Sequence, residues 1–155
     1  MLNIVLYQPE IPQNTGNIAR TCAITDTKLH LIKPLGFSLS EKAVKRAGLD
    51  YWPLLNLTVY DNFDDFLCQN KNANIFLLST HAKRLYNQTR FPDNAFLLFG
   101  KETAGVPDFI HNKYCDTRFR IPMKIHPDAR SLNLSNAVSI VLYEALRQND
   151  FFDLK

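Results

Sequence analysis

The chain has 155 residues, of which 46% are hydrophobic and 21% are charged, and its formal net charge at pH 7 is +3. A chain of this length and composition is most simply one globular domain, residues 1–155, with a sizeable core. The weak net charge excludes a globally basic nucleic-acid-binding protein, so any contact with nucleic acid must come from a local patch.

Short apolar runs bounded by turn residues predict β-strands. They occupy residues 2–7, 29–32, 57–60, 75–78 and 95–99, and a strand-like piece follows at 118–121. Helical patterns over 15–25, 40–47, 61–70 and 132–148 alternate with them. Near-continuous apolar strands suit a parallel sheet that is covered on both faces. We therefore expect an α/β fold with an open, mostly parallel sheet and helices on both faces.

The first residues lack the basic lead and long apolar run of a signal peptide, and no segment is long enough to span a bilayer. Cys22, Cys68 and Cys115 are odd in number and far apart, which argues against a disulfide framework and against structural zinc. We expect a cytoplasmic protein with no membrane contact and no metal.

The first predicted helix is preceded by a polar stretch that ends the first strand. Ile18, Ala19 and Cys22 give this helix a buried face, while Asn17 and Arg20 share the opposite one. Ligand sites in open α/β sheets lie at the carboxyl ends of strands, and an Arg beside amides can hold a phosphate or a ribose hydroxyl. A surface Arg beside a capping Asn is the alternative interpretation.

A two-glycine loop follows the strand at 95–99. Gly100 allows the backbone to approach a ligand closely, and Gly105 can take a positive φ. A phosphate-binding loop is disfavoured because Ala95 stands where its first glycine should be and Glu102 would face the phosphate. Glu102 suits a cationic or hydroxyl-rich ligand instead, or it holds the backbone of a loop.

The third polar segment runs directly into the last helix. Ser131, Asn133 and Ser135 can cap the helix start or direct its free N–H groups at a ligand. A helix start with many hydrogen-bonding groups and little charge suits a polar ligand of adenosine size. A well-capped helix with no ligand is the alternative.

The last helix carries two stripes. Residues 134, 137, 138, 141, 142, 145 and 146 form an apolar stripe for the core. Asn136, Ile140, Tyr143 and Arg147 form a mixed stripe that fits contact with another subunit, although a surface helix with stray apolar residues gives the same pattern.

Basic residues form separate clusters that could meet nucleic acid or could simply be solvated. The clusters are Lys42, Lys45 and Arg46; Lys83 and Arg84; and Arg118, Arg120, Lys124 and Arg130. Common hydrolase and zinc-enzyme motifs are absent, and the four histidines are scattered.

The segments at 14–20, 99–103 and 121–123 with 131–136 resemble, in this order, the SPOUT class of S-adenosylmethionine-dependent RNA methyltransferases. Within the class, the opening residues 4–12 and the short length look like the minimal tRNA wobble-position 2′-O-methyltransferases. The resemblance implies a deep trefoil knot in the C-terminal part of the chain and a homodimer that packs through the first and last helices.

The resemblance also implies roles for individual residues. Arg20 would be the catalytic residue. The S-adenosylmethionine site would comprise Leu78, Ser79, Thr80, Gly100, Glu102, Ile121, Met123, Ser131 and Leu132. The tRNA substrate would contact Asn14, Asn17, Arg130, Asn133 and Tyr143. Because a guanidinium normally stays protonated, Arg20 either accepts the proton of the attacking hydroxyl or only positions that hydroxyl.

We expect 2′-O-methylation of the wobble nucleotide of tRNA, cytidine or uridine at position 34. A ribosomal RNA target is the nearest rival, although enzymes of that kind often carry an extra N-terminal RNA-binding domain that we do not expect here. Two further hypotheses are a non-catalytic RNA-binding protein that retains the fold and a small Rossmann-type nucleotide enzyme.

Overall fold

The computed structural model describes residues 1–39, 51–124, 126 and 131–155. The strands are β1 (Asn3–Tyr7), β2 (Lys28–Ile32), β3 (Leu57–Tyr60), β4 (Asn74–Leu78), β5 (Ala95–Phe99) and β6 (Arg118–Phe119). The α-helices are α1 (Pro12–Ile24), α3 (Phe63–Gln69), α4 (Asp108–Lys113) and α5 (Leu134–Gln148). Single 3₁₀ turns occur at η1 (Trp52–Leu54), η2 (Tyr86–Gln88) and η3 (Cys115–Thr117).

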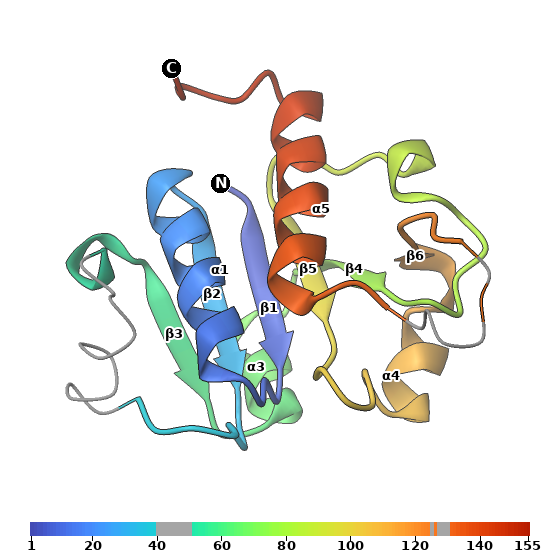
Figure 1. Ribbon diagram of the computed structural model, residues 1–155, viewed down its shortest axis with the longest axis horizontal. Helices are drawn as coiled ribbons and strands as arrows, with labels where there is room; N and C mark the ends of the chain where they lie inside the picture. The colour runs from blue at the N-terminus through green and yellow to red at the C-terminus, as the bar shows by residue number, and fades with distance from the viewer. Residues whose placement is uncertain (40–50, 125, 127–130) are drawn as a thin grey trace.

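The strands form one sheet in the order β3-β2-β1-β5-β4-β6, and all neighbouring pairs are parallel (Figure 1). Leu6 in β1, for example, lies between Leu31 of β2 and Phe99 of β5. The prediction of an open parallel α/β sheet is confirmed. The predicted helix at 40–47 lies outside the described residues.

Helices cover both faces of the sheet, as predicted. On one face α1 and α5 pack side by side, and their apolar residues join Ile4 and Leu6 in the larger core (Figure 1). On the other face Phe63 and Phe66 of α3 and Ile110 of α4 join the second core. Side chains of β1 enter both cores, because successive side chains of a strand point to opposite faces of the sheet.

Helix boundaries follow from local capping chemistry. Helix α1 begins at Pro12, three residues before the predicted start, because proline at the first helical positions sacrifices no intrahelical bond. Helices α3 and α5 begin two residues later than predicted, because Asn62 and Asn133 act as N-caps and accept backbone N–H groups with their side chains. The six-residue α4 was not predicted, and the strand-like piece at 118–121 shortens to β6.

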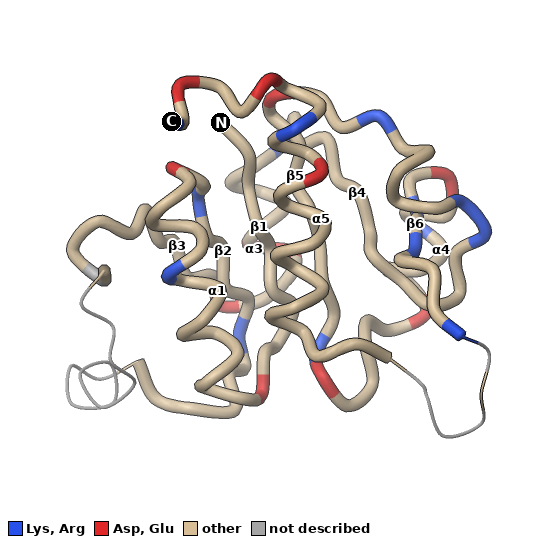
Figure 2. The backbone as a smooth tube through the Cα atoms, turned by 45° about the horizontal axis from the view of Figure 1, so that its top comes forward, with Lys and Arg blue, Asp and Glu red and all other residues tan. Residues whose placement is uncertain are grey.

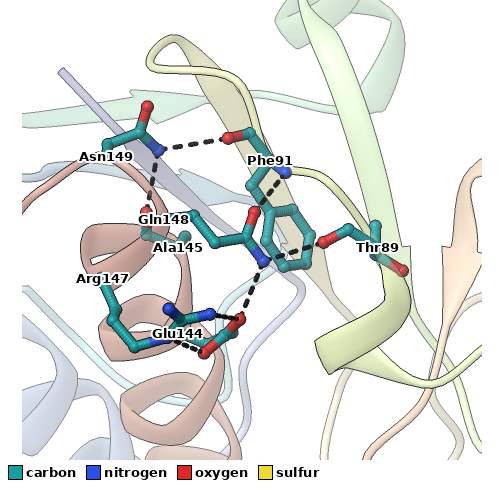
Figure 3. Close-up of polar contacts among 7 residues, drawn as sticks. All are labelled: Thr89, Phe91, Glu144, Ala145, Arg147, Gln148 and Asn149. Carbon is teal, nitrogen blue, oxygen red and sulfur yellow. Dashed lines mark hydrogen bonds and ion pairs between the residues drawn. The ribbon is translucent and has the colours of Figure 1, made fainter.

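The end of α5 is fastened to the loop between β4 and β5 (Figure 3). Gln148 donates its Nε2 to Thr89 O at 2.9 Å and accepts the Phe91 N–H at 2.9 Å. Asn149 donates its Nδ2 to Phe91 O at 3.1 Å. The Phe91 side chain is fully buried and contacts the rings of Phe76 and Phe119. The loop after β4 is therefore held against the same face of the sheet as α5.

A buried polar chain lies in the core under α3. His30 Nε2 is 3.1 Å from Asn3 Oδ1, and His30 Nδ1 is 2.8 Å from Tyr60 OH. Because an amide oxygen only accepts, the neutral ring carries its proton on Nε2 and accepts from Tyr60. Tyr60 in turn accepts from Asn70 Nδ2 at 3.2 Å. Burial, with a smaller contribution from Lys28, lowers the pKa of His30 to about 3, so the ring is neutral at pH 7.

Candidate functional site

A cavity of about 580 Å³ opens at the carboxyl ends of β4, β5 and β6. Its walls come from the loops that follow these strands and from the segment that leads into α5. All nine residues predicted to hold the cofactor line it: Leu78, Ser79, Thr80, Gly100, Glu102, Ile121, Met123, Ser131 and Leu132. Segments that lie far apart in the chain therefore meet around one space of the size of ordinary ligand pockets.

The glycine loop after β5 closes on itself. A Cβ at Gly100 would lie 2.3 Å from the carbonyl carbon of Gly105, so only glycine fits there. Gly105 has φ +67°, which confirms its predicted positive φ. Lys101 and Gly105 exchange two backbone hydrogen bonds at 2.9 and 3.1 Å. The close approach that Gly100 permits is thus to its own loop.

Glu102 holds the start of α1. Its carboxylate accepts the N–H of Glu10 at 2.8 Å, the N–H of Ile11 at 3.2 Å and the Nδ2 of Asn14 at 3.0 Å. Ile11 is the N-cap residue and has no side chain that could cap the helix. Glu102 therefore accepts two backbone N–H groups immediately before the helix and places a negative charge at its positive end.

Glu10 makes a second connection between the segment before α1 and the loop after β5. Its carboxylate accepts the backbone N–H of Thr103 at 3.0 Å and the Thr103 hydroxyl at 2.8 Å. These bonds, from the side chain first and the backbone second, lower the pKa of Glu10. Sequence reasoning did not find Glu10, because nothing in its local pattern shows which distant loop it meets.

Asn14 and Asn133 line the cavity, but they bind each other. Asn133 Nδ2 donates to Asn14 Oδ1 at 2.9 Å, and Asn133 Oδ1 accepts from Ser135 Oγ and the Ser135 N–H. Asn14 is buried, and its own Nδ2 is engaged by Glu102. The predicted contact of both residues with RNA stays a prediction, yet these amides already have protein partners. We call the set Glu102, Asn14, Asn133 and Ser135 the amide relay.

Asn17, Tyr143 and the predicted catalytic residue Arg20 lie on the outer surface. Asn17 and Arg20 are exposed on α1 and do not line the cavity, and Arg20 Cζ lies 4.8 Å from the centre of the Tyr51 ring. Arg20 is six residues beyond Asn14, which is about 9 Å along the helix. Tyr143 is 47% exposed on α5. Arg130 lies outside the described residues.

Several cavity residues were not predicted. They are Ile11, His81, Phe99, Lys101, Thr103, Ala104, Gly105, Val106, His111, Arg120, Leu134 and Ala137. His81 and His111 lie with ring centres 5.5 Å apart and planes at 79°. Burial lowers the pKa of His111, and the nearby His81 and Arg118 add to this while Asp108 opposes it. The unpredicted helix α4 carries His111, so no sequence signal pointed to this pair.

The structure joins two basic clusters that are separate in sequence. Arg120 donates its N–H to Arg84 O at 2.9 Å, and Tyr86 donates its N–H to Arg120 O at 2.9 Å. Lys83 and Arg84 therefore lie beside the residues that follow β6, and Figure 2 shows Lys and Arg positions around this side of the sheet. We call Lys83, Arg84, Arg118, Arg120 and Lys124 the basic edge. The cluster at 42–46 lies outside the described residues.

A family model described as the SpoU rRNA methylase family matches residues 1–143. The chain belongs to this family. It is 47% identical to the tRNA (cytidine(34)-2'-O)-methyltransferase of Methylovorus glucosotrophus, with 97% of each chain covered. It also aligns at 46% identity and a TM-score of 0.89 with a structure solved for insight into 2-OH methylation of C/U34 on tRNA, again with 97% of each chain covered.

A more distant family member has been solved with its cofactor. The SpoU methyltransferase AviRb from Streptomyces viridochromogenes, solved in complex with the cofactor AdoMet, matches with a TM-score of 0.80 and 25% identity. This match covers 97% of the present chain and 61% of that one.

Among the described residues of the present chain, no helix is long and apolar enough to cross a membrane, and no His, Cys, Asp or Glu cluster could hold a metal ion.

Proposed function

We propose that this chain transfers a methyl group from S-adenosylmethionine to the 2′-hydroxyl of the wobble nucleotide of tRNA, cytidine or uridine at position 34. The observation that carries the proposal is the convergence of Gly100, Ile121 and Ser131 around one cavity. The 47% identity to a relative named for that reaction, over nearly the whole of both chains, supports the substrate. We place this activity in the cytoplasm, where tRNA is modified.

The cavity has the chemistry that an adenosyl group requires. Leu78, Ile121, Met123 and Leu132 offer apolar surface for a base, and Ser79, Thr80 and Ser131 offer hydroxyl and backbone groups for its polar edge and the ribose. When bound, S-adenosylmethionine supplies a methyl group on a sulfonium, which is already a good leaving group. The protein must therefore mainly align two ligands, and such alignment can supply roughly 7–11 kcal/mol.

Arg20 is the residue that we assign to the substrate hydroxyl. Its exposed guanidinium can donate to a ribose oxygen or to the adjoining phosphate and so hold the sugar in line with the methyl group. We assign it positioning and charge stabilisation, because a guanidinium normally stays protonated. As the O–CH3 bond forms and the sulfonium C–S bond breaks, the hydroxyl proton passes to solvent water. Arg20 does not line the cavity of its own chain. It therefore acts either on RNA that lies over the outer face of α1 or on RNA at the cavity of a second subunit.

We also propose a homodimer through α1 and α5. Ile24, Ile140 and Tyr143 are 53%, 38% and 47% exposed on the outer faces of these adjacent helices. A deep trefoil knot in the C-terminal part is a further part of the proposal. It is supported by the resemblance to the SPOUT class and by the membership of the SpoU methylase family.

The test is methylation of an unmodified tRNA transcript with isotopically labelled S-adenosylmethionine, followed by nucleoside analysis. We expect label in the 2′-O-methyl nucleoside from position 34, and none when that nucleotide carries a 2′-deoxyribose. A ribosomal RNA target is the second candidate, because the description of the family model names rRNA. Label in ribosomal RNA but not in tRNA would favour it. Cofactor binding without transfer to any RNA would favour a binding protein.

A further inference from the structure

Asn14 and Asn133, two of the residues predicted to contact RNA, already have protein partners in the amide relay. The amide of Asn14 is engaged at both ends, and that of Asn133 binds Asn14 and the start of α5. Sequence-independent affinity for RNA comes mainly from Lys and Arg side chains that contact phosphates. Because the net charge is only +3, the place where basic residues cluster determines where RNA can bind.

The basic edge is such a place. Lys83 and Arg84 come from the loop after β4, whereas Arg118, Arg120 and Lys124 belong to β6 and its continuation. A parallel bridge between Leu85 and Arg120, together with the two flanking hydrogen bonds, fixes these segments side by side. The arrangement is therefore set by the backbone and not by flexible side chains alone.

The charges of the basic edge have no carboxylate partner among the described residues. Within the described part of the chain, none of its five side chains forms an ion pair with a carboxylate, and Asp116, two residues before Arg118, forms none with it. All of them except the half-buried Arg118 are exposed. Like charges held together repel each other, so the cluster gains from binding a polyanion, and the condensed counter-ions of the nucleic acid are released when its phosphates are neutralised.

The basic edge is also continuous with the cavity. Arg120 lines the cavity and at the same time pairs through its backbone with Arg84. Phosphates bound along the edge would therefore belong to nucleotides next to the one whose ribose enters the cavity.

We propose that the basic edge binds the phosphate backbone of the tRNA substrate beside the target nucleotide. This inference rests on the proposed function, and it adds a surface formed by Lys83, Arg84, Arg118, Arg120 and Lys124. The edge acts through charge and position, so it contributes affinity without choosing the sequence of the RNA.

The test compares two double variants of equal charge change. Lys83→Gln/Arg84→Gln removes two charges from the edge at residues that do not line the cavity. The matched control, Lys71→Gln/Arg90→Gln, removes an exposed Lys and an exposed Arg near the amino ends of β4 and β5. Unchanged melting temperatures establish that both variants fold.

The dissociation constant for an unmodified tRNA transcript is measured across salt concentrations. Losing two phosphate contacts should reduce the slope of log affinity against log salt by about 1.4–1.8 and weaken binding at 0.1 M salt by about tenfold or more. The control should retain the wild-type slope within about 0.5. In the transfer assay the edge variant should show a raised KM for tRNA, an unchanged kcat and an unchanged affinity for S-adenosylmethionine.

Equal slopes for the edge variant and the control would overturn the proposal even if wild type methylates tRNA. Conversely, a slope that falls only in the edge variant, in a protein that transfers no methyl group, would support the edge and overturn the proposed function. The two inferences can therefore fail separately.

Discussion

Asn133 donates its side-chain N–H to Asn14 Oδ1 at 2.9 Å, although 119 positions separate the two residues. Asn14 in turn donates its side-chain N–H to Glu102, while Asn133 caps α5. One line of hydrogen bonds thus connects the starts of α1 and α5 with the loop after β5. The three polar segments of the sequence are consequently one unit, and a change in any of them should be felt in the cavity.

Substituting Asn133 separates the two tasks of its side chain. Asn133→Ser keeps a good N-cap but is too short to reach Asn14, whereas Asn133→Ala loses both functions. We expect Asn133→Ala to lower the free energy of unfolding by about 1 kcal/mol more than Asn133→Ser. Both should weaken S-adenosylmethionine binding in calorimetry by roughly five- to tenfold, in line with the loss of about one hydrogen bond. Wild-type affinity in Asn133→Ser would remove the relay from the cofactor site.

Arg20→Ala should separate binding from turnover. Because Arg20 does not line the cavity, we expect the affinity for S-adenosylmethionine and the melting temperature to stay near wild type. The rate of methyl transfer to tRNA should fall by at least about 10²-fold, since a group that orients the reacting hydroxyl is lost. Arg90→Ala, which removes another exposed Arg, should transfer methyl groups normally. A fully active Arg20→Ala would exclude this residue from the mechanism.

The outer faces of α1 and α5 give a test of oligomeric state. Ile140→Asp places a charge in the mixed stripe, where burial against a second subunit would be costly. We expect sedimentation velocity to show a shift from dimer toward monomer at micromolar concentration. Phe109→Asp is the control, because Phe109 is 56% exposed on α4 at the opposite face of the sheet. The dimer assignment does not survive if both variants sediment like wild type.

Much of the fold is readable from local patterns. The strands at 57–60 and 95–99 have their predicted bounds, because continuous apolar runs between turn residues identify buried parallel strands. Helix α4 escapes prediction, because six residues are too few to display a helical period. Pro12 starts helix α1 three residues before the predicted start, because a proline there carries no helical pattern of its own.

The residues of the site could not be predicted from local patterns in the same way as the strands. The nine cavity residues follow from family resemblance, since no pattern in one segment indicates which distant segment it will meet. The sequence leaves Glu102 open between a ligand contact and a loop anchor, and the structure shows that it anchors the start of α1. His111 and Glu10 give no signal, because their importance depends on tertiary neighbours alone.

Gln148 should matter more for stability than the charged residue beside it. Its side chain satisfies Thr89 O and the Phe91 N–H, and Gln148→Ala would leave both backbone groups without these partners. We expect a loss of about 1–3 kcal/mol in urea unfolding. Arg147→Ala breaks the two bonds to Glu144, whose side chain is only 12% exposed but keeps its bond to Gln148, so we expect a smaller cost of about 1 kcal/mol. Equal costs for the two variants would contradict this account of how α5 is fastened.

His30 predicts how stability responds to acid. Its pKa is lowered to about 3 in the folded chain, whereas an unfolded chain protonates histidine near 6.5. Between these values the unfolded state binds a proton that the folded state refuses, so stability is present above pH 6.5 and falls as the pH is lowered. The loss from this group approaches about 1.4 kcal/mol per pH unit.

His30→Gln removes the titration together with part of the buried hydrogen-bond chain to Asn3 and Tyr60. Urea unfolding at pH 7, 6, 5 and 4 should show a variant that is less stable at pH 7 but loses less stability toward pH 4. If the His30→Gln curve instead runs parallel to wild type, the acid sensitivity has another source, because a constant offset reports lost contacts and only a changed slope reports a lost proton.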